Sequence, residues 1–591
     1  MPIKKDDKYQ VDENKRWFKK WWPKNVPKNT SFEEKSINEM FDEQVEKYRD
    51  NNMIWFLETW VTYGEVQEYV KKLATALHNL GIRKGDVVAM HLPNSIQYIV
   101  GYYAITRIGA IVSGINPTYQ PMEILHQLDI IKPKALIVLD ALYEPYIKPI
   151  IDKSSVEILI YTNVADLAHG LGIKRFLGKL LKKIPKGKVD RPGAIKFMDL
   201  LDTEPNVPEV EFDVKTHPVT YIMTGGTTGL PKAAVLTHFN AVSNAHQSTL
   251  WLGGEDPGLG SVGVLPLFHS FAHTVVMNTA ISFGGWMMLF PRPPDTEELL
   301  ETIEELPSPK GLVYAGAEIL FKRLAEFDRI NEYPGVMGKL KLCVSGAGPL
   351  HKPVRDAFVE NTGGRIVEGY GLSEATPVVS AGNLFGESPM GTIGMPFPGT
   401  EWGIWPVDKF SDPIALGNPD DTKFGEENTG EICVHGPQVM LEYLNQPEET
   451  EDTVKEYNGA LWLRTGDIGF MNEDGTIEIR DRKKQLIKYK GYSVYPKEVE
   501  ELLMKNPEIS EAAVAGIPHE EFGEAVKAWI ELTPESNLTV EEIKAWAEDN
   551  MTHYKRPTYI ELIKEIPKDN IGKVQRRILQ INDPLYKERQ K

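Results

Sequence analysis

The chain has 591 residues, of which 41% are hydrophobic and 25% are charged, a composition typical of folded globular proteins that excludes a disordered chain. Its 84 acidic and 66 basic side chains give a formal net charge of −18, which argues against nucleic acid as a partner because phosphate binding requires a basic surface. Two cysteines are too few for a disulfide framework or a cysteine-based zinc site. The charged N-terminus lacks the apolar core of a signal peptide, and no apolar stretch reaches the length of a membrane-spanning helix. We therefore expect a cytoplasmic protein.

Helical periodicity and short apolar strands alternate along the first two thirds of the chain. Strands and helices that alternate at this spacing predict a parallel sheet covered on both faces, so we expect α/β architecture over about 36–390. The predicted elements are helices within 37–45 and 66–80 and at 95–108, 121–131 and 354–362, and strands at 53–57, 86–92, 110–114, 135–139, 340–345 and 365–368.

The pattern changes after Gly391. Short strands at 430–434, 475–479 and 485–487, separated by Pro, Gly and Asn, predict a small β subdomain. Four charged residues at 481–484 interrupt the apolar strands and predict a domain boundary. A compact α+β region should follow, with helices at 496–505 and 539–549 and strands at 511–515, 525–531 and 558–562.

A basic amphipathic segment at 168–188 does not fit the α/β pattern. Its apolar residues lie broadly on one helical face, and seven Lys or Arg residues accompany them without an acidic residue. A basic amphipathic helix in an acidic chain suits contact with an anionic membrane surface. The alternative is a surface insertion whose apolar face packs on the body of the protein.

A glycine- and threonine-rich loop follows a predicted strand at 219–223. The segment 221–232 (YIMTGGTTGLPK) contains three glycines and three threonines before Lys232. Glycines let backbone N–H groups approach phosphate oxygens, and threonine hydroxyls add donors, so the loop is suited to bind an anion. Its spacing differs from the GxxxxGK[ST] phosphate loop, and read alone it also fits a Gly/Thr-rich hairpin.

Two further segments carry side chains that suit a nucleotide. In EGYGLSEAT (368–376), Tyr370 can lie against a flat base, and Glu374 offers a carboxylate of the kind that Mg²⁺ uses beside phosphates. In LRTGDIG (463–469), Asp467 offers two acceptor oxygens to the hydroxyls of a ribose. Read alone, each segment also fits a solvent-exposed turn.

Two basic segments, 481–500 and 566–577, place Arg or Lys beside Gly. Such residues could neutralise phosphate charge from a second domain, and the alternative is a solvated basic loop.

The order of these motifs resembles the acyl-adenylate-forming superfamily, which includes acyl-CoA synthetases, peptide-synthetase adenylation domains and luciferases. The resemblance is carried by TGGTTGLPK, EGYGLSEA, GTIGMPFPG, LRTGDIGF, DRKKQLIKYKGYSVYPKEVE and IPKDNIGK, and LPNSIQY and HYKRPTYIEL extend it over nearly the whole chain. WFKKWWPKNVPKN near the N-terminus and the segment 168–188 resemble the long-chain fatty acyl-CoA synthetases. The resemblance implies a large AMP-binding domain over 1–481, a small mobile domain over 482–591 and a hinge at Lys484.

The resemblance also implies which residues bind ATP and Mg²⁺. Glu374, helped by Thr224, would bind the metal, while Asp467 and Arg482 would contact the ribose or phosphate. The phosphate loop would consist of Thr224, Gly225, Gly226, Thr227, Thr228, Gly229 and Lys232. The adenine and α-phosphate region would be lined by Gly346, Ala347, Gly348, Glu368, Gly369, Tyr370, Gly371 and Ser373. In SGAGPL (345–350) the commoner Gly-Ala order is inverted, which leaves the backbone path intact.

Four residues are implied for the reaction itself. Lys573 would approach the reacting carboxylate and the α-phosphate, and His269 would lie at the mouth of the acyl and pantetheine tunnels. Lys488 and Gly491 would serve the step that uses the thiol of coenzyme A.

The expected function is therefore an ATP-dependent fatty acid–CoA ligase that works through an acyl-adenylate, releasing pyrophosphate and then AMP. Its substrates would be a fatty acid, ATP and CoA, and its oligomeric state stays open. The alternatives are a medium-chain or aryl acid–CoA ligase, an enzyme that loads a carrier protein, and a binding module without catalysis. A long apolar tunnel is predicted from Phe268, Phe271, Phe283, Trp286, Met287 and Met288 with the small Gly316 and Ala317.

Overall fold

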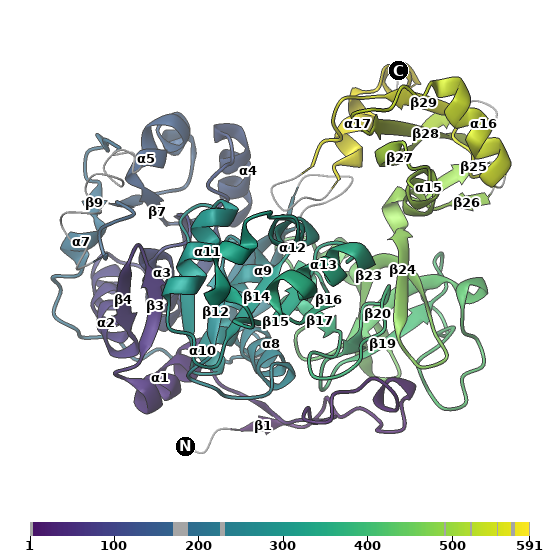
Figure 1. The fold of residues 1–591 in the computed structure, drawn as a ribbon. Coiled ribbons are helices and arrows are strands. Elements are labelled where there is room, and N and C mark those ends of the chain that lie inside the picture. The colour runs from purple at the N-terminus through teal and green to yellow at the C-terminus, as the bar shows by residue number, and fades with distance from the viewer. Residues whose placement is uncertain are drawn as a thin grey trace.

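The structure, a computed structural model, describes residues 4–168, 187–224, 231–489, 492–519, 523–551, 553–568 and 574–589. Two large sheets and a β subdomain form the N-terminal part of the molecule, and a smaller domain stands apart from them (Figure 1). The strand β24 (Ile477–Arg482) runs from the β subdomain toward this smaller domain. Among the described residues, no helix has both the length and the apolar character needed to cross a membrane.

The first sheet has eight strands in the order β21-β11-β10-β6-β5-β7-β8-β9. Every neighbouring pair from β10 to β9 is parallel, whereas β11 and β21 join antiparallel at one edge. Its strands are β5 (Val87–His91), β6 (Ile111–Gly114), β7 (Ala135–Leu139), β8 (Ile158–Thr162), β9 (Ile195–Lys196), β10 (Pro218–Thr224), β11 (Lys232–Thr237) and β21 (Glu442–Tyr443).

The second sheet has nine strands in the order β18-β17-β16-β15-β14-β12-β13-β3-β4. The pairs from β16 to β3 are parallel, and antiparallel strands lie at both edges. Its strands are β3 (Asn52–Phe56), β4 (Thr59–Thr62), β12 (Gly260–Gly263), β13 (Trp286–Leu289), β14 (Leu312–Gly316), β15 (Leu340–Ser345), β16 (Ile366–Gly371), β17 (Val378–Ala381) and β18 (Met395–Pro396).

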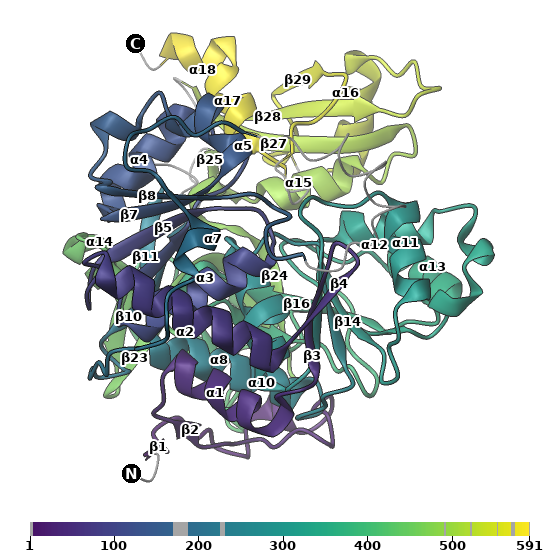
Figure 2. The same cartoon turned by 90° about the vertical axis from the view of Figure 1, so that its left-hand side faces the viewer.

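A layer of helices lies between the two sheets, and the largest hydrophobic core is built there (Figure 2). Ser36, Thr62 and Thr237 begin three of these helices with capping boxes, which satisfy backbone N–H groups that would otherwise lack partners. The helices of the N-terminal part are α1 (Ile37–Tyr48), α2 (Tyr63–Asn79), α3 (Ile96–Arg107), α4 (Pro121–Ile131), α5 (Asp140–Leu142), α7 (Phe197–Leu200), α8 (His238–Trp251), α9 (Ser270–Ala272), α10 (Thr279–Ser282), α11 (Thr296–Glu305), α12 (Glu318–Ala325), α13 (Lys352–Thr362) and α14 (Pro447–Thr453).

The β subdomain and the small C-terminal domain each contain one five-stranded sheet. The subdomain comprises β19 (Glu401–Trp405), β20 (Gly430–His435), β22 (Val454–Tyr457), β23 (Ala460–Met471) and β24. The small domain has its own apolar core and comprises β25 (Ile487–Tyr489), β26 (Tyr492–Val494), β27 (Ile509–His519), β28 (Gly523–Leu532), β29 (Tyr559–Leu562), α15 (Pro496–Leu503), α16 (Val540–Asn550), α17 (Arg576–Asn582) and α18 (Pro584–Arg589).

The N-terminal segment lies along the underside of the large domain and reaches the β subdomain (Figure 1). It forms a two-stranded sheet from β1 (Lys5–Asp6) and β2 (Phe32–Glu33). Trp17 is fully buried against Trp402 of β19, and the Arg16 guanidinium donates hydrogen bonds to backbone oxygens that include Asn418 O at 3.0 Å. These contacts fasten the β subdomain to the rest of the large domain.

The mixed α/β fold with a small C-terminal domain is confirmed, and two expectations about its details are wrong. Residues 485–487 do not form one strand of the β subdomain, because Gln485 ends a 3-10 turn and Ile487 begins β25 in the small domain. The apolar run at 286–288 does not line one tunnel. Successive side chains of a strand point to opposite faces, so Met287 packs in the central core while Trp286 and Met288 pack in a second core. Most of the segment at 168–188 lies outside the described residues.

Candidate active site

The predicted phosphate loop connects two antiparallel strands at the end of the first sheet. Strand β10 ends at Thr224 and β11 begins at Lys232, and these residues are partners in the register of the pair. Thr224 is buried, and the Lys232 ammonium forms an ion pair with Glu449 of α14. The sheet therefore fixes both ends of the loop. The loop itself lies outside the described residues, and with it Gly225, Gly226, Thr227, Thr228 and Gly229.

Glu374 lies in a short 3-10 turn, η7 (Ser373–Ala375), that follows β16. This turn packs against β10 and β11, so Glu374 comes close to the base of the phosphate loop. Tyr443 Oη donates a hydrogen bond to Glu374 Oε1 at 2.7 Å. In the described part of the chain, Glu374 Oε2 has no hydrogen-bond partner, which leaves one carboxylate oxygen for a ligand.

The chemistry of this corner fits Mg²⁺. Magnesium usually takes one or two protein carboxylates together with phosphate oxygens. Glu374 Oε2 is a suitable hard ligand, and the Thr224 hydroxyl at the end of β10 can supply a second oxygen. The assignment of these two residues as metal ligands stays a prediction.

The strand β16 carries the residues predicted to line the adenine. A Cβ on Gly369 would lie 2.5 Å from Val344 Cγ1, and one on Gly371 would lie 2.2 Å from Pro377 O, so both positions require glycine. Between them Tyr370 is buried, and its hydroxyl donates to Asp467 Oδ2 at 2.6 Å. Two glycines thus let neighbouring strands close around the tyrosine.

Glu368 lies in the same strand, opposite Ser345 of β15. Burial raises the pKa of Glu368 to about 7, and the positive charges of Lys497 and His351 limit the increase. Lys497 belongs to α15, so the small domain contributes to the electrostatics at this edge of the large domain.

The turn after β15 carries Gly346, Ala347 and Gly348. Gly346 N donates to Gly316 O at 2.9 Å, and a Cβ at Gly346 would lie 3.0 Å from the Phe271 ring. Ala347 has a φ of 64°, in the left-handed region that favours glycine. The predicted residues His269 and Ala347 share one small pocket, which is lined by Leu265, Pro266, His269, Phe271, Ala317 and Ala347. Beside it, Ser373 and Ser270 hydroxyls lie 3.0 Å apart.

Asp467 and Arg482 form the predicted ribose corner. They are partners in the register of β23 and β24, and Arg482 Nε lies 2.6 Å from Asp467 Oδ1. Since Tyr370 occupies Oδ2, both carboxylate oxygens have a donor. Asp467 is only 2% exposed. The sequence did not indicate that the Tyr370 hydroxyl would donate a hydrogen bond to it.

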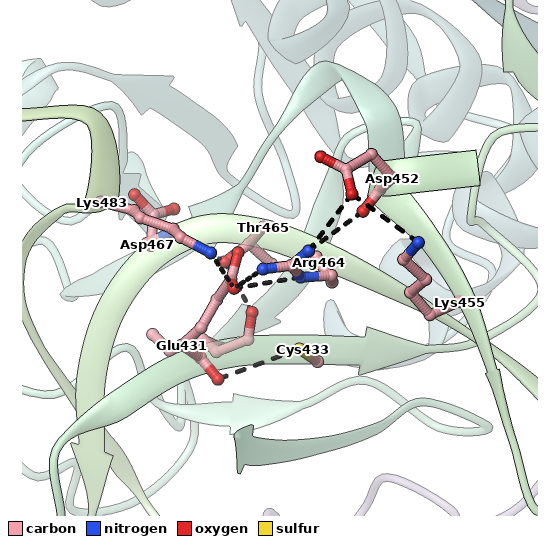
Figure 3. Close-up of polar contacts among 9 residues, drawn as sticks. Glu431, Cys433, Asp452, Lys455, Arg464, Thr465, Asp467 and Lys483 are labelled. Atoms are coloured by element: carbon pink, nitrogen blue, oxygen red, sulfur yellow. Dashed lines mark hydrogen bonds and ion pairs between the residues drawn. The ribbon is translucent and has the colours of Figure 1, made fainter. Parts of the chain in front are cut away.

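A buried carboxylate behind this corner fixes the strand that carries Asp467. Glu431 of β20 accepts from Arg464 Nη2 at 2.6 Å and from Lys483 Nζ at 3.0 Å (Figure 3). Arg464 is three residues before Asp467, and Lys483 directly follows Arg482. The Glu431 cluster (Glu431, Arg464 and Lys483) therefore ties both members of the ribose corner to β20.

The connection to the small domain begins in the same place. After β24, the turn η9 (Lys483–Gln485) contains Lys484 and leads to β25. Asp481 Oδ2 accepts from Lys497 N at 2.6 Å, and Arg576 donates to Gln485 Oε1 at 3.0 Å. The first contact joins the end of the large domain to α15 of the small domain, and the second joins the turn η9 to α17.

Three predicted residues of the small domain cannot be placed as functional side chains. Gly491 and Lys573 lie outside the described residues. The backbone of Lys488 lies in β25, opposite Ser493, and its side chain is not described.

Comparison with known proteins now identifies the family. Residues 41–444 match the family described as AMP-binding enzyme, and residues 498–573 match the AMP-binding enzyme C-terminal domain. The chain belongs to the AMP-binding enzyme family. The site built on the β10–β11 hairpin, β16 and the Asp467–Arg482 pair lies within or beside the two matched regions.

Curated relatives and a solved structure with a similar fold each cover almost the entire chain. A long-chain-fatty-acid–CoA ligase of Bacillus subtilis is 33% identical over 577 residues, which are 96% of this chain and 98% of the relative. A long-chain-fatty-acid–CoA ligase of Escherichia coli O157:H7 is 33% identical over 575 residues, with the same coverage. The crystal structure of ATP-bound MatB from Rhodopseudomonas palustris has a TM-score of 0.75 and 22% identity, and covers 93% of this chain and 100% of that one.

Two residues of the site were not anticipated from the sequence. Tyr443 and Glu431 belong to segments that carry no glycine-rich or charged motif of their own. Tyr443 follows Glu442 in a two-residue strand, and Glu431 precedes three apolar residues in β20. For Glu431, the sequence offered one signal, which is a single Glu within an apolar predicted strand. A charge that is buried in such a strand requires a partner.

Proposed function

We propose that this AMP-binding enzyme is an ATP-dependent ligase that joins long-chain fatty acids to coenzyme A. The observation that carries the proposal is the match to long-chain-fatty-acid–CoA ligases over 96% of the chain. The geometry supports it, because Thr224, Lys232 and Glu374 lie around the base of one loop. A carboxylate requires such a site because its own oxygen is a poor leaving group.

In the first step, the fatty acid carboxylate attacks the α-phosphate of ATP, and pyrophosphate leaves. In this proposal Lys232, at the end of the loop, binds the phosphates, and Asp467 with Arg482 binds the ribose; their positions in the β10–β11 pair and the β23–β24 pair support these roles. Bound Mg²⁺ would neutralise phosphate charge beside Glu374. Lys573 keeps the role implied by resemblance, at the carboxylate and the α-phosphate. In the second step the thiol of CoA attacks the acyl carbonyl and AMP leaves.

We infer that the small domain, 482–591, moves between these steps about Lys484. The Glu431 cluster supports this position, because it fastens Lys483 to the large domain while Gln485 is bonded to Arg576 of the small domain. Lys484 is therefore the residue between two anchored neighbours. A hinge of a few residues can absorb such a rotation.

A panel of acids tests the proposed substrate. The enzyme is supplied with ATP, Mg²⁺ and CoA, and AMP release and thioester formation are measured for acids from acetate to stearate and for benzoates. Since each buried CH₂ contributes ~0.8 kcal/mol, kcat/KM should rise a few-fold per carbon until the pocket ends. A higher kcat/KM for acetate or benzoate than for palmitate would refute the long-chain assignment, and thioester formed only on a carrier protein would refute CoA as the acceptor.

Peripheral membrane contact through 168–188 is part of the same proposal. The basic composition of the segment supports it, since each Lys or Arg near an anionic surface contributes ~1 kcal/mol. Deleting residues 170–186 should weaken sedimentation with anionic liposomes and leave turnover of detergent-solubilised acid intact. Equal sedimentation with and without the segment would assign it to packing on the protein.

A further inference from the structure

The segment around β21 contacts two parts of the proposed nucleotide site. One is the β10–β11 hairpin, which includes Lys232, and the other is the turn that carries Glu374. Tyr443 of β21 pairs with Ala234 of β11, and Leu444 N donates to Ala233 O at 2.9 Å. Shortly before it, Met440 N donates to Glu374 O at 2.8 Å. The backbone of this segment is thus bonded both to the phosphate hairpin and to the turn that carries Glu374.

The side chain of Tyr443 repeats this bridging arrangement. Its hydroxyl donates to Glu374 Oε1 at 2.7 Å, and its ring centroid lies 5.1 Å from Lys232 Nζ. The residue is only 7% exposed, and its own N–H donates to Thr450 Oγ1 at 2.9 Å, so the ring has little freedom. The Lys232 ammonium is also paired with Glu449, which lies in the first turn of α14.

We propose that Tyr443 is a positioning residue of the nucleotide site, which orients Glu374 for the metal and holds Lys232 for the phosphates. A phenol that occupies one carboxylate oxygen fixes the rotation of the carboxylate and directs the cation to the other oxygen. Glu449 neutralises Lys232 until phosphate oxygens replace it. The inference rests on the proposed function and deepens it. It assigns a role to Tyr443, which lies outside both the motif of Lys232 and the motif of Glu374.

The decisive variant is Tyr443→Phe, which removes the hydroxyl and keeps the ring. Mn²⁺ serves as the probe, and its binding to the full-length enzyme with a non-hydrolysable ATP analogue is followed by electron paramagnetic resonance. Loss of a hydrogen bond to a metal-ligating carboxylate typically weakens metal affinity by about 10–100-fold, and we expect about tenfold. The conversion of synthetic palmitoyl-adenylate to palmitoyl-CoA should change by less than about twofold, since that step follows the release of pyrophosphate.

Tyr63→Phe is the matched control. Tyr63 is fully buried and donates its hydroxyl to Gly285 O at 2.6 Å, and it lies in α2, an element that carries none of the site residues described above. It should destabilise the protein by a similar amount and leave Mn²⁺ affinity unchanged. A second variant, Glu449→Gln, removes the competing charge on Lys232 and should tighten binding of the ATP analogue by a few-fold at most, because Glu449 is half exposed.

The outcomes separate the inference from the proposed function. Wild-type Mn²⁺ affinity in Tyr443→Phe would overturn the positioning role. Tyr443→Phe could also lose activity equally in both half-reactions while its thermal stability equals that of Tyr63→Phe. That result would assign Tyr443 to packing and would likewise overturn the positioning role. If the wild-type enzyme itself fails to bind Mn²⁺ with the nucleotide analogue, the proposed function falls and takes the inference with it. If the wild-type enzyme makes palmitoyl-CoA and Tyr443→Phe binds Mn²⁺ with unchanged affinity, the inference is refuted and the proposed function stands.

Discussion

The phosphate corner and the ribose corner of the site hold their carboxylates in different ways. Among the residues that the structure describes, Tyr443 is the one hydrogen-bond donor to the Glu374 carboxylate, and Oε2 has none. Asp467 has a donor on each oxygen, from Arg482 and from Tyr370, and is almost completely buried. The first carboxylate therefore keeps an oxygen for the cation that we propose it binds, whereas the second already has its counter-charge from the protein.

This difference fits the two ligands that we propose for the two carboxylates. A metal ion brings positive charge and needs an oxygen without a competing donor. Ribose hydroxyls are neutral, so a carboxylate that receives them must be neutralised by the protein, or burial would disfavour its ionised form. Arg482 supplies that charge, and the Glu431 cluster keeps the strand pair in register.

The largest expected effect is that of Asp467→Asn. Removing one partner of a buried ion pair typically costs about 3–5 kcal/mol, and the cost to stability is smaller here because the Arg482 side chain is 37% exposed to solvent. We expect kcat/KM for ATP to fall by about 10³-fold, measured by pyrophosphate exchange, with a lower thermal midpoint. A loss of catalysis without any loss of stability would mean that the Arg482 charge is solvated in the free enzyme and that the ribose corner is not prepared in advance.

Glu374→Gln should have a smaller effect on catalysis and almost none on stability. The change keeps the hydrogen bond to Tyr443 but replaces the charged oxygen by a neutral amide group, and a contact to a charged group is worth about 1.5–3 kcal/mol. We expect a fall of about 10–100-fold in kcat/KM for Mg²⁺–ATP, partly restored at higher Mg²⁺ concentration. An effect that is independent of Mg²⁺ concentration would contradict the role of Glu374 as a metal ligand.

A third carboxylate, Glu368, differs from both, because it forms no ion pair with a residue that the structure describes, and the charges of Lys497 and His351 only limit the rise of its pKa. Its pKa is raised to about 7 by burial, so the folded state favours the protonated form. The wild-type protein should lose stability as the pH rises from the unfolded pKa of about 4.5 through 7, because only the unfolded chain ionises freely. Glu368→Gln mimics the protonated group and should raise the thermal midpoint at pH 8 much more than at pH 5. Glu360→Gln, at an exposed position of α13, is the matched control for the loss of one carboxylate.

The smallest expected effect concerns the turn beside the pocket. Ala347 has a φ of 64°, whereas a Cβ at Gly348 would meet nothing within 4 Å. A left-handed conformation costs a non-glycine residue about 1–2 kcal/mol. The double change Ala347→Gly and Gly348→Ala should therefore stabilise the protein by about 1 kcal/mol in urea unfolding. A decrease in stability would show that the Ala347 side chain contributes more in the pocket than its backbone strain costs.

Local patterns predicted most of the fold because each depends on residues close in the chain. The helix α4 and the strands β7 and β15 have the predicted bounds, and Ser95 caps α3 as its position before an apolar helix suggests. The exceptions are segments whose environment is set elsewhere. Periodicity distinguishes a strand from a helix, but it does not tell whether both faces of β13 are covered, and this decided that Trp286 and Met287 belong to different cores.

For the site, the sequence by itself determined the ligand types. Three features depend only on residue type, which the sequence gives directly. They are the glycines where neighbouring strands come close, the threonine-rich loop, and the single carboxylates in ordered motifs. Tertiary structure alone decided the partners. Tyr370 and Asp467 are 97 residues apart, Glu374 and Tyr443 are 69 apart, and Glu431 and Lys483 are 52 apart. A hydrogen bond extends over about 3 Å, so pairs this distant in the chain can be recognised only after the sheets have brought their strands together.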